Sequence, residues 1–403
     1  MLPSGWKRVK LSDFIKSLDA GVSVNSVDEP ASNNKIGILK TSCVSSGTFN
    51  PNENKTVVEA DLNRVSTPVK ADRIILSRMN SPSLVGANAY VEKDYSNLYL
   101  PDRLWQLEPY SNKMSMRWLS YVLCRQETKS IFLNMATGTS NSMKNITKED
   151  VLNLKVIFPP FEEQKKIAET LSVWDKAIEK TEKLIEAKET VLSEYGRNLF
   201  GKTNRNVRND WDVVALSSVL NEHGDKSTGK EEVYSVSVHK GLVNQIEHLG
   251  RSFAAKNTTN YNRVHYGDIV YTKSPTGDFP LGIVKQSLVE DDVIVSPLYG
   301  VFTPKTFELG VILDFYFSSA INANNYLHPI AQKGAKNTIN ITNKKFLSAK
   351  LCLPLNLKEQ KKVAEFIQVT KKEMSVLQEI LENYKKQKEG LMQKLLTGQW
   401  RVK

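Results

Sequence analysis

A charged, helix-forming segment occurs twice in this chain, about 196 residues apart. Residues 163–169 read Glu-Gln-Lys-Lys-Ile-Ala-Glu, and residues 359–365 read Glu-Gln-Lys-Lys-Val-Ala-Glu. This period is too long for a solenoid repeat and matches the size of a whole domain with its connecting helix. The sequence therefore predicts two similar modules related by pseudo-symmetry, an arrangement suited to a target with two parts.

Apolar residues in both charged segments recur at alternating steps of four and three, which is the heptad pattern of a coiled coil. The first seam comprises Ile167, Leu171, Trp174, Ile178, Ile185, Leu192 and Leu199. The second seam comprises Val363, Ile367, Met374, Leu377, Leu381, Leu391 and Leu395. Because each seam needs an apolar partner, we predict that the two helices pair as an antiparallel coiled coil. The alternative is that each helix packs on a separate domain.

The remaining sequence is rich in β-forming segments broken by Gly, Pro, Asn and Ser. Strand-like runs are found at 35–44, 73–78 and 98–107 in the first half and at 233–238, 268–273 and 293–302 in the second half. We predict an α+β fold with two β-rich domains and two long helices. The predicted boundaries are 1–158 for the first domain, 159–202 for the central helix, 203–354 for the second domain and 355–403 for the last helix.

The charge distribution favours a nucleic-acid partner. The chain carries 55 Lys+Arg and 44 Asp+Glu, a net charge of +11. Residues 162–202 contain 8 basic and 9 acidic residues, and residues 358–398 contain 9 and 6. The helical segments thus hold +2 of the charge, and the other +9 lies mostly in the globular halves. Such an excess suits a phosphate backbone, although a soluble basic protein without that function is an alternative.

Other classes of protein are disfavoured by the sequence. No apolar stretch approaches the length needed to cross a bilayer, so we expect a cytoplasmic protein. The three cysteines and five histidines lack metal-ligand spacing, so we expect no metal site.

Residues 196–203 match the GxxxxGK[ST] phosphate-loop pattern, but they follow a long helix instead of a strand. Phe158 stands where an amino-methyltransferase motif needs a polar side chain. Asp102 and Glu108 suggest a nuclease, but the accompanying lysine is absent. We therefore expect no catalytic residue.

Cations, hydroxyls and amides at predicted strand ends and loops are the candidate DNA contacts, because such groups bind phosphates and base edges. The first half supplies Lys40, Thr41, Ser42, Arg78, Asn80, Lys144 and Asn145. The second half supplies His239, Lys240, Lys273, Ser274, Thr276, Lys336 and Asn337. Any one of these residues could be an ordinary surface residue, but the matched positions in both halves strengthen the set.

Several short sequence segments, spread over essentially the whole chain, together resemble the specificity subunit of Type I restriction-modification enzymes. They are the Trp-Lys-Arg-Val-Lys-Leu-Ser opening at 6–12, the strands at 71–78 and 267–273, the segments beginning at Gly138 and Gly334, the Pro-Pro-Phe-Glu-Glu-Gln-Lys-Lys-Ile-Ala helix start at 159–168, and the Leu-Leu-Thr-Gly ending at 395–398. The second helix start lacks the Pro-Pro pair, which is a modest departure.

The resemblance implies two target recognition domains, each reading half of a split double-stranded DNA site, with the coiled coil setting their spacing. It also implies two methyltransferase subunits bound to this chain, joined by restriction/translocase subunits. S-adenosylmethionine, ATP and Mg²⁺ would belong to those partners, and this chain would be non-catalytic. The alternative from another class is a stand-alone DNA-binding regulatory or scaffold protein of the same fold.

Overall fold

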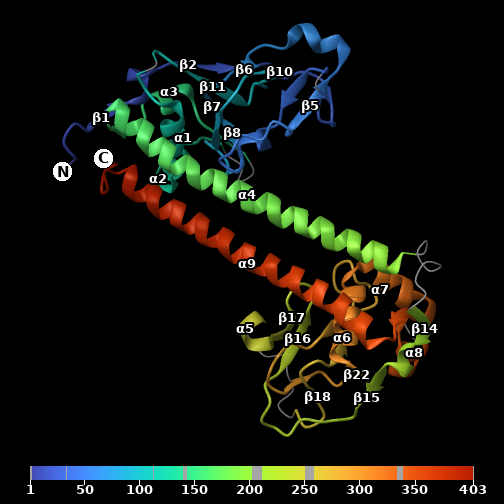
Figure 1. The fold of residues 1–403 in the computed structure, drawn as a ribbon. Coiled ribbons are helices and arrows are strands. Elements are labelled where there is room, and N and C mark those ends of the chain that lie inside the picture. The colour runs from blue at the N-terminus through green and yellow to red at the C-terminus, as the bar shows by residue number, and fades with distance from the viewer. Residues whose placement is uncertain are drawn as a thin grey trace. The chain divides into compact units, whose positions relative to one another are not determined.

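The computed structural model describes residues 2–32, 34–111, 113–138, 143–201, 211–249, 258–333 and 339–402. These residues form two compact units (Figure 1). Unit 1 comprises Met1–Thr181 and Ile380–Lys403, and unit 2 comprises Glu182–Glu379. Each unit therefore contains one globular domain and a stretch of both long helices, α4 (Phe161–Phe200) and α9 (Leu357–Leu395).

The globular part of unit 1 contains two larger sheets and three short α-helices. Its elements are β1 (Lys7–Lys10), η1 (Leu11–Asp13), β2 (Ile15–Ala20), β3 (Ser26–Val27), β4 (Gly37–Leu39), η2 (Thr41–Val44), β5 (Asn54–Val57), η3 (Glu59–Arg64), β6 (Pro68–Val69), β7 (Arg73–Ser77), β8 (Met79–Asn80), β9 (Asn88–Val91), β10 (Tyr95–Tyr99), β11 (Leu104–Pro109), α1 (Met116–Cys124), α2 (Gln126–Met135), β12 (Lys144–Asn145), α3 (Lys148–Leu152) and β13 (Lys155–Phe158).

The globular part of unit 2 follows a related plan. Its elements are β14 (Trp211–Ala215), η5 (Leu216–Ser218), β15 (Leu220–Glu222), β16 (Tyr234–Ser237), β17 (Gly241–Asn244), α5 (Gln245–Leu249), β18 (Asn262–Val264), β19 (Ile269–Tyr271), β20 (Val284–Gln286), β21 (Val293–Val295), β22 (Gly300–Pro304), α6 (Phe307–Ser318), α7 (Ala320–Leu327), η6 (His328–Ile330), β23 (Gln332–Lys333), β24 (Ile339–Asn340), α8 (Asn343–Ser348) and β25 (Lys350–Pro354).

Sheet order shows which parts of the two units correspond. The four-stranded sheet of unit 1 has the order β2-β11-β7-β9, and unit 2 repeats it as β15-β22-β19-β20. In both units the first strand pairs antiparallel with the strand that precedes the long helix, as β1 with β13 and β14 with β25. Unit 1 adds a five-stranded sheet, β3-β5-β4-β10-β6, where unit 2 has the smaller pairs β16-β17 and β18-β21. The framework is thus repeated and the added strands differ.

The two long helices pack together in antiparallel fashion within each unit (Figure 1). In unit 1 the Trp174 and Tyr384 rings meet edge to face with centroids 5.7 Å apart, and Lys388 binds Asp175. In unit 2 Lys188 Nζ lies 2.6 Å from Glu373 Oε2. In both units, residues later in α4 meet residues earlier in α9, so the predicted antiparallel α+β architecture is confirmed.

The heptad positions lie along the protected side of each helix. All fourteen predicted seam residues are buried or half-buried. In unit 1, Ile167, Leu171 and Leu395 join the hydrophobic core of the globular domain. In unit 2, Leu199, Val363 and Ile367 do the same. The seam therefore has two roles, because it joins the helices to each other and also joins each helix end to its domain.

The glutamine of the repeated Glu-Gln pair has the same structural role in both units. Gln164 and Gln360 are almost fully buried. Gln164 Nε2 donates to Pro159 O at 2.9 Å, and its Oε1 accepts from the backbone N–H of Ser115, the residue that caps α1. Gln360 Nε2 likewise donates to Pro354 O at 2.9 Å, and its Oε1 accepts from the hydroxyl of Thr306, the cap of α6. Since buried amides need such partners, each glutamine fastens a long helix to its domain.

Trp6 also fastens helix α4 to the globular domain of unit 1. Trp6 Nε1 donates to Glu163 Oε2 at 3.0 Å, and Arg401 holds the same carboxylate through Nε and Nη2 at 2.6 and 2.8 Å. Arg401 Nη1 also donates to Ser4 O at 3.3 Å. Residues near both ends of the chain are therefore joined at the start of α4.

Two predicted strands are wrong in extent. The run 98–107 is divided between β10 and β11, with Pro101 between them, and the run 293–302 is divided between β21 and β22, with Pro297 between them. Proline has no amide hydrogen for the sheet ladder and interrupts each run. The run 35–44 also changes at Thr41 from strand to 3₁₀ helix. The domain boundaries remain predictions.

Candidate nucleic-acid interface

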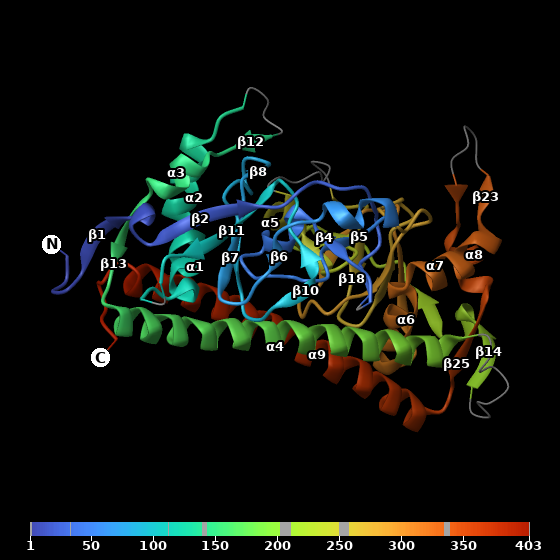
Figure 2. The same ribbon diagram turned by 90° about the horizontal axis from the view of Figure 1, so that it is seen from above.

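Four of the predicted DNA contacts lie together in unit 1, at the end of strand β7. Arg78 directly follows β7 and leads into β8, which pairs antiparallel with β12 (Figure 2). The register places Lys144 opposite Asn80 and Asn145 opposite Met79. The backbone N–H of Ile146 also donates to Arg78 O at 3.0 Å. A short ribbon therefore gathers two cations and two amides from distant parts of the sequence.

Arg78 has the chemistry of a ligand-contacting side chain. Its guanidinium lies 5.9 Å from the centroid of the Trp105 ring, which is buried, and its Nη2 is 3.9 Å from Asp102 Oδ2. That distance is too long for a hydrogen bond. Its Nε is buried and has no hydrogen-bond partner among the residues that the structure describes. The Trp105 ring therefore supports the guanidinium through a cation–π contact, and the planar fork suits a ligand with paired acceptors.

The other residues of the ribbon have local partners. Asn80 Nδ2 donates to Ser77 Oγ at 3.3 Å, and Asn80 Oδ1 accepts from the backbone N–H of Ser81 at 2.9 Å. Lys144 Nζ donates to Gly138 O at 3.0 Å. An ammonium has three donors, so this bond leaves capacity for a phosphate oxygen.

The predicted group at residues 40–42 lies on the five-stranded sheet, at the start of η2. Lys40 Nζ is 3.0 Å from Asp28 Oδ1, and Lys55 Nζ is 3.4 Å from the same oxygen. Hydrogen bonds from these two lysines lower the pKa of Asp28. The Ser42 hydroxyl bonds to Glu53, and Thr41 O accepts from Ser45 Oγ at 3.5 Å. Since Lys40 and Ser42 already contact carboxylates, this group is a weaker candidate than the β8–β12 ribbon.

Lys273 lies near the corresponding strand end in unit 2, two residues after the last residue of β19. It adopts a left-handed backbone conformation with φ 59°, which is uncommon for a residue with a side chain. Gly282 packs against it so closely that an added Cβ would lie 2.8 Å from Lys273 N. Burial lowers the pKa of Lys273. The exposed Ser274 and Thr276 continue this loop, and Thr276 pairs with Phe279 through backbone hydrogen bonds of 2.9 and 3.1 Å.

The remaining predicted contacts of unit 2 lie elsewhere. His239 and Lys240 are exposed at the turn of the β16–β17 hairpin. Lys336 and Asn337 lie outside the described residues. The structure therefore associates Lys273 with Ser274 and Thr276 and does not place His239 in that loop.

One further candidate was missed from the sequence. Arg103 is exposed, and its carbonyl accepts from the backbone N–H of Arg78 at 3.1 Å. The backbone bond places these two arginines side by side at one end of the sheet. A signal was present in the Pro-Asp-Arg turn before β11, but sequence alone does not show that this turn lies next to β7.

The side chains of Asp102 and Glu108, which suggested a nuclease in the sequence, are both engaged by other residues of the protein. Glu108 accepts two hydrogen bonds from Arg73, at 2.7 Å from Nε and 2.8 Å from Nη2. Asp102 accepts from the Ser23 hydroxyl and faces Arg78. The phosphate-loop pattern is also unsuitable, because residues 196–200 belong to helix α4 and Leu199 is buried in the core. Residues 202 and 203 lie outside the described part of the chain.

Comparisons with known proteins agree with this architecture. Residues 3–189 match the Type I restriction modification DNA specificity domain. The EcoEI specificity subunit of Escherichia coli is 30% identical over 171 residues, which is 42% of this chain and 29% of that protein. The putative MjaX specificity subunit of Methanocaldococcus jannaschii is 28% identical over 353 residues, covering 82% of this chain and 79% of that protein.

The fold has a solved counterpart. The crystal structure of a Type I restriction-modification S subunit from M. genitalium superposes with a TM-score of 0.63 at 15% identity, covering 98% of each chain. The repeated α+β domains with paired long helices thus share the fold of that S subunit. By sequence, residues 3–189 thus match a Type I restriction modification DNA specificity domain, and most of the chain is similar to a putative Type I restriction enzyme specificity subunit.

Within the described ranges, no helix combines the length and apolar character that crossing a bilayer requires. Cys43 and Cys124 are free thiols. Cys43 is fully buried, and burial raises the pKa of its thiol.

Proposed function

We propose that this chain supplies the DNA sequence specificity of a Type I restriction-modification complex. Each globular domain would read one half of a bipartite double-stranded site, and the long helices would fix the spacing. The observation that carries the proposal is a cation just beyond the third strand of the repeated four-stranded sheet in both units. Arg78 is the first residue after β7 in unit 1, and Lys273 is the second residue after β19 in unit 2. The same framework thus has a cation near the same strand end in both units.

The surroundings of these two cations differ, as two readers of different sequences require. Arg78 carries a planar fork that matches the O6 and N7 acceptors of guanine. It stands beside a β-ribbon with Asn80 and Lys144. Lys273 is a point charge at the start of a loop with hydroxyl side chains. We infer that the two domains recognise unlike half-sites.

The helices would also dock methyltransferase subunits. In unit 2 a groove along the paired helices is lined by apolar side chains that remain exposed, namely Leu184, Val191, Phe366 and Val369. Exposed apolar side chains in one groove are typical of a protein-binding surface. Two methyltransferase subunits and the restriction/translocase subunits would then provide catalysis, with S-adenosylmethionine, ATP and Mg²⁺ bound to them. This chain would act without catalysis of its own, in the cytoplasm where its DNA lies.

Reconstitution with a methyltransferase subunit of a Type I system from the same genome would test the proposal. The complex should methylate DNA only at a split site with two defined halves and a spacer of fixed length and free sequence. Mapping methylated adenines in DNA from a host that expresses both subunits would measure this. A continuous recognition site, or co-purification without methylation, would contradict the proposal. DNA binding without a methyltransferase partner would instead favour a stand-alone DNA-binding protein.

A further inference from the structure

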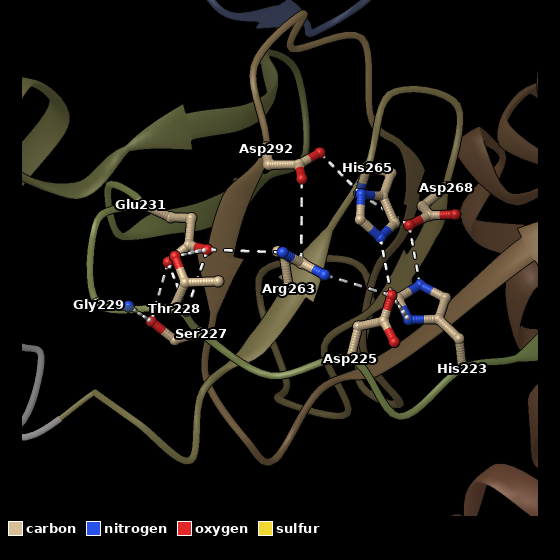
Figure 3. Close-up of polar contacts among 10 residues, drawn as sticks. All are labelled: His223, Asp225, Ser227, Thr228, Gly229, Glu231, Arg263, His265, Asp268 and Asp292. Carbon is tan, nitrogen blue, oxygen red and sulfur yellow. Dashed lines mark hydrogen bonds and ion pairs between the residues drawn. The ribbon is translucent and has the colours of Figure 1, made fainter.

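Two histidines of unit 2 each bond to a carboxylate through one ring nitrogen (Figure 3). His223 Nε2 lies 2.9 Å from Asp268 Oδ2. His265 Nδ1 lies 2.7 Å from Asp292 Oδ1. Such a pairing fixes the orientation of an imidazole and leaves its second nitrogen pointing elsewhere.

The second nitrogens of both rings point at the same carboxylate, Asp225 (Figure 3). His265 Nε2 is 3.1 Å from Asp225 Oδ2, and His223 Nδ1 is 3.9 Å from the same oxygen. All three candidate ligand atoms lie within 4.8 Å of one another. In tetrahedral zinc sites with bonds of about 2.0–2.1 Å, neighbouring ligand atoms are roughly 3.3 Å apart. Small side-chain movements would therefore bring these three atoms around one ion.

The supporting residues are rigidly placed. Asp268 is buried and accepts two more hydrogen bonds, from His265 N at 2.8 Å and from Thr303 Oγ1 at 2.7 Å. His223 follows β15, His265 follows β18 and Asp268 precedes β19, so the group joins three separate strands. A carboxylate behind each histidine is the usual outer shell of a metal site, where it increases the basicity of the ligand.

The charge of this group favours a cation. Three carboxylates, those of Asp225, Glu231 and Asp292, face one guanidinium, that of Arg263 (Figure 3). Asp268, which is bonded to His223, adds a fourth carboxylate to the group. Arg263 is 3.7 to 4.0 Å from the carboxylates it faces, which is too far for hydrogen bonds. His223 Nδ1 is buried and has no hydrogen-bond partner within the described part of the chain, although a buried polar atom normally has one. A cation bound between the rings would balance the charge and use this nitrogen.

We propose that His223 Nδ1, Asp225 Oδ2 and His265 Nε2 bind a divalent transition metal of the Zn²⁺ class. Two imidazoles and one carboxylate suit Zn²⁺ better than Mg²⁺ or Ca²⁺, which prefer all-oxygen sites. A water molecule would complete the tetrahedron. The ion would join the connection after β15 to the strands β18 and β19, and so stabilise the strand that leads to Lys273. Sequence spacing did not reveal this site, because its ligands come from segments about 40 residues apart.

Zinc titration of the untagged, EDTA-treated full chain by calorimetry tests the site. The wild-type chain should bind one Zn²⁺ per chain, and Co²⁺ should give the intense visible absorption of a tetrahedral complex. The double variant His223→Gln/His265→Gln should lose at least about 100-fold in affinity through loss of two ligands. Asp292→Asn should lose about 10- to 100-fold, because it removes only the support of His265.

His328→Gln provides the matched control, because His328 is an exposed histidine of the same unit. It should bind Zn²⁺ as the wild type does. Circular dichroism would confirm that each variant is folded, and Asp292→Asn keeps the test informative if the double variant fails to fold. The proposal is overturned if the wild-type chain binds no Zn²⁺ or if the double variant retains wild-type affinity. In that event His265 would be a protonated imidazolium paired with the two carboxylates. Burial alone lowers the pKa of His265, but hydrogen bonds to Asp292 and Asp225 raise this pKa overall.

Discussion

Replacing Ile367 by aspartate should strongly destabilise unit 2. Ile367 is fully inaccessible to solvent and belongs to the core that joins α9 to the globular domain. The change removes a buried aliphatic side chain, which costs about 2–5 kcal/mol. It also places a carboxylate where no cation compensates it, which costs several kcal/mol more unless the group is neutralised. We expect the free energy of unfolding of unit 2 to fall by at least about 4 kcal/mol. Thermal unfolding followed by circular dichroism and limited proteolysis would measure the loss.

Gln368→Asp is the matched control, since Gln368 is the next residue of α9 and is exposed. The charge change is the same, but the free energy of unfolding should stay within about 0.5 kcal/mol of the wild type. Ile367→Val, which keeps the apolar surface, should cost only about 1 kcal/mol. Equal unfolding temperatures for Ile367→Asp and Gln368→Asp would contradict the role of the seam.

Replacing Arg78 by alanine should weaken specific DNA binding and relax the preference in one half-site. Loss of a forked contact with a base costs about 1–3 kcal/mol, or about 10- to 100-fold in affinity. The fold should tolerate the change, because the Arg78 side chain is 32% exposed, its ion pair with Asp102 is long at 3.9 Å, and its Cζ is 5.9 Å from the Trp105 ring centroid. Affinity for duplexes that carry each base at every position of the half-site would measure the effect in the assembled complex.

Two variants separate base reading from charge. Arg78→Lys keeps the cation but loses the fork, so non-specific affinity should persist while the preference in that half-site falls. Arg64→Ala removes the same charge from η3 of the same unit, where Arg64 is paired with Asp61 at 2.9 Å, and should leave the preference unchanged. If Arg64→Ala and Arg78→Ala reduce binding equally and without change of preference, Arg78 contributes only general charge.

The architecture could be predicted from the sequence because its signals are local and repeated. The heptad spacing from Ile167 to Leu199 and from Val363 to Leu395 marks both helices and their buried side. The repeated Gln164 and Gln360 mark where each helix joins its domain. Such features depend on periodicity along one segment, which sequence displays directly.

The details of the candidate DNA site could not be predicted in the same way, because they depend on contacts between distant segments. No local pattern shows that the two-residue strand β12 pairs with β8, or that Arg78 lies over Trp105. The same holds for His223 and His265, which lie on different strands and meet only through Asp225. The type of a loop residue can make it a candidate DNA contact. Its neighbours in the folded structure then decide whether its hydrogen-bond donors are available to DNA.

The differences between the two domains bear on function as much as their similarities do. In both units a cation, Arg78 or Lys273, lies just beyond the third strand of the shared four-stranded sheet, whereas the five-stranded sheet occurs in unit 1 and the proposed metal site in unit 2. A common framework with unlike added strands is what two readers of unlike half-sites require. The central claim is therefore a division of labour between the domains.

Exchange of one domain tests this claim most directly. Residues 1–158 would be replaced by the equivalent domain of a relative with a different target, and methylated adenines would be mapped in cells that express the methyltransferase. The account predicts that one half-site changes to that of the relative, while the other half-site and the spacer length stay the same. A change in both half-sites, or in neither, would contradict it.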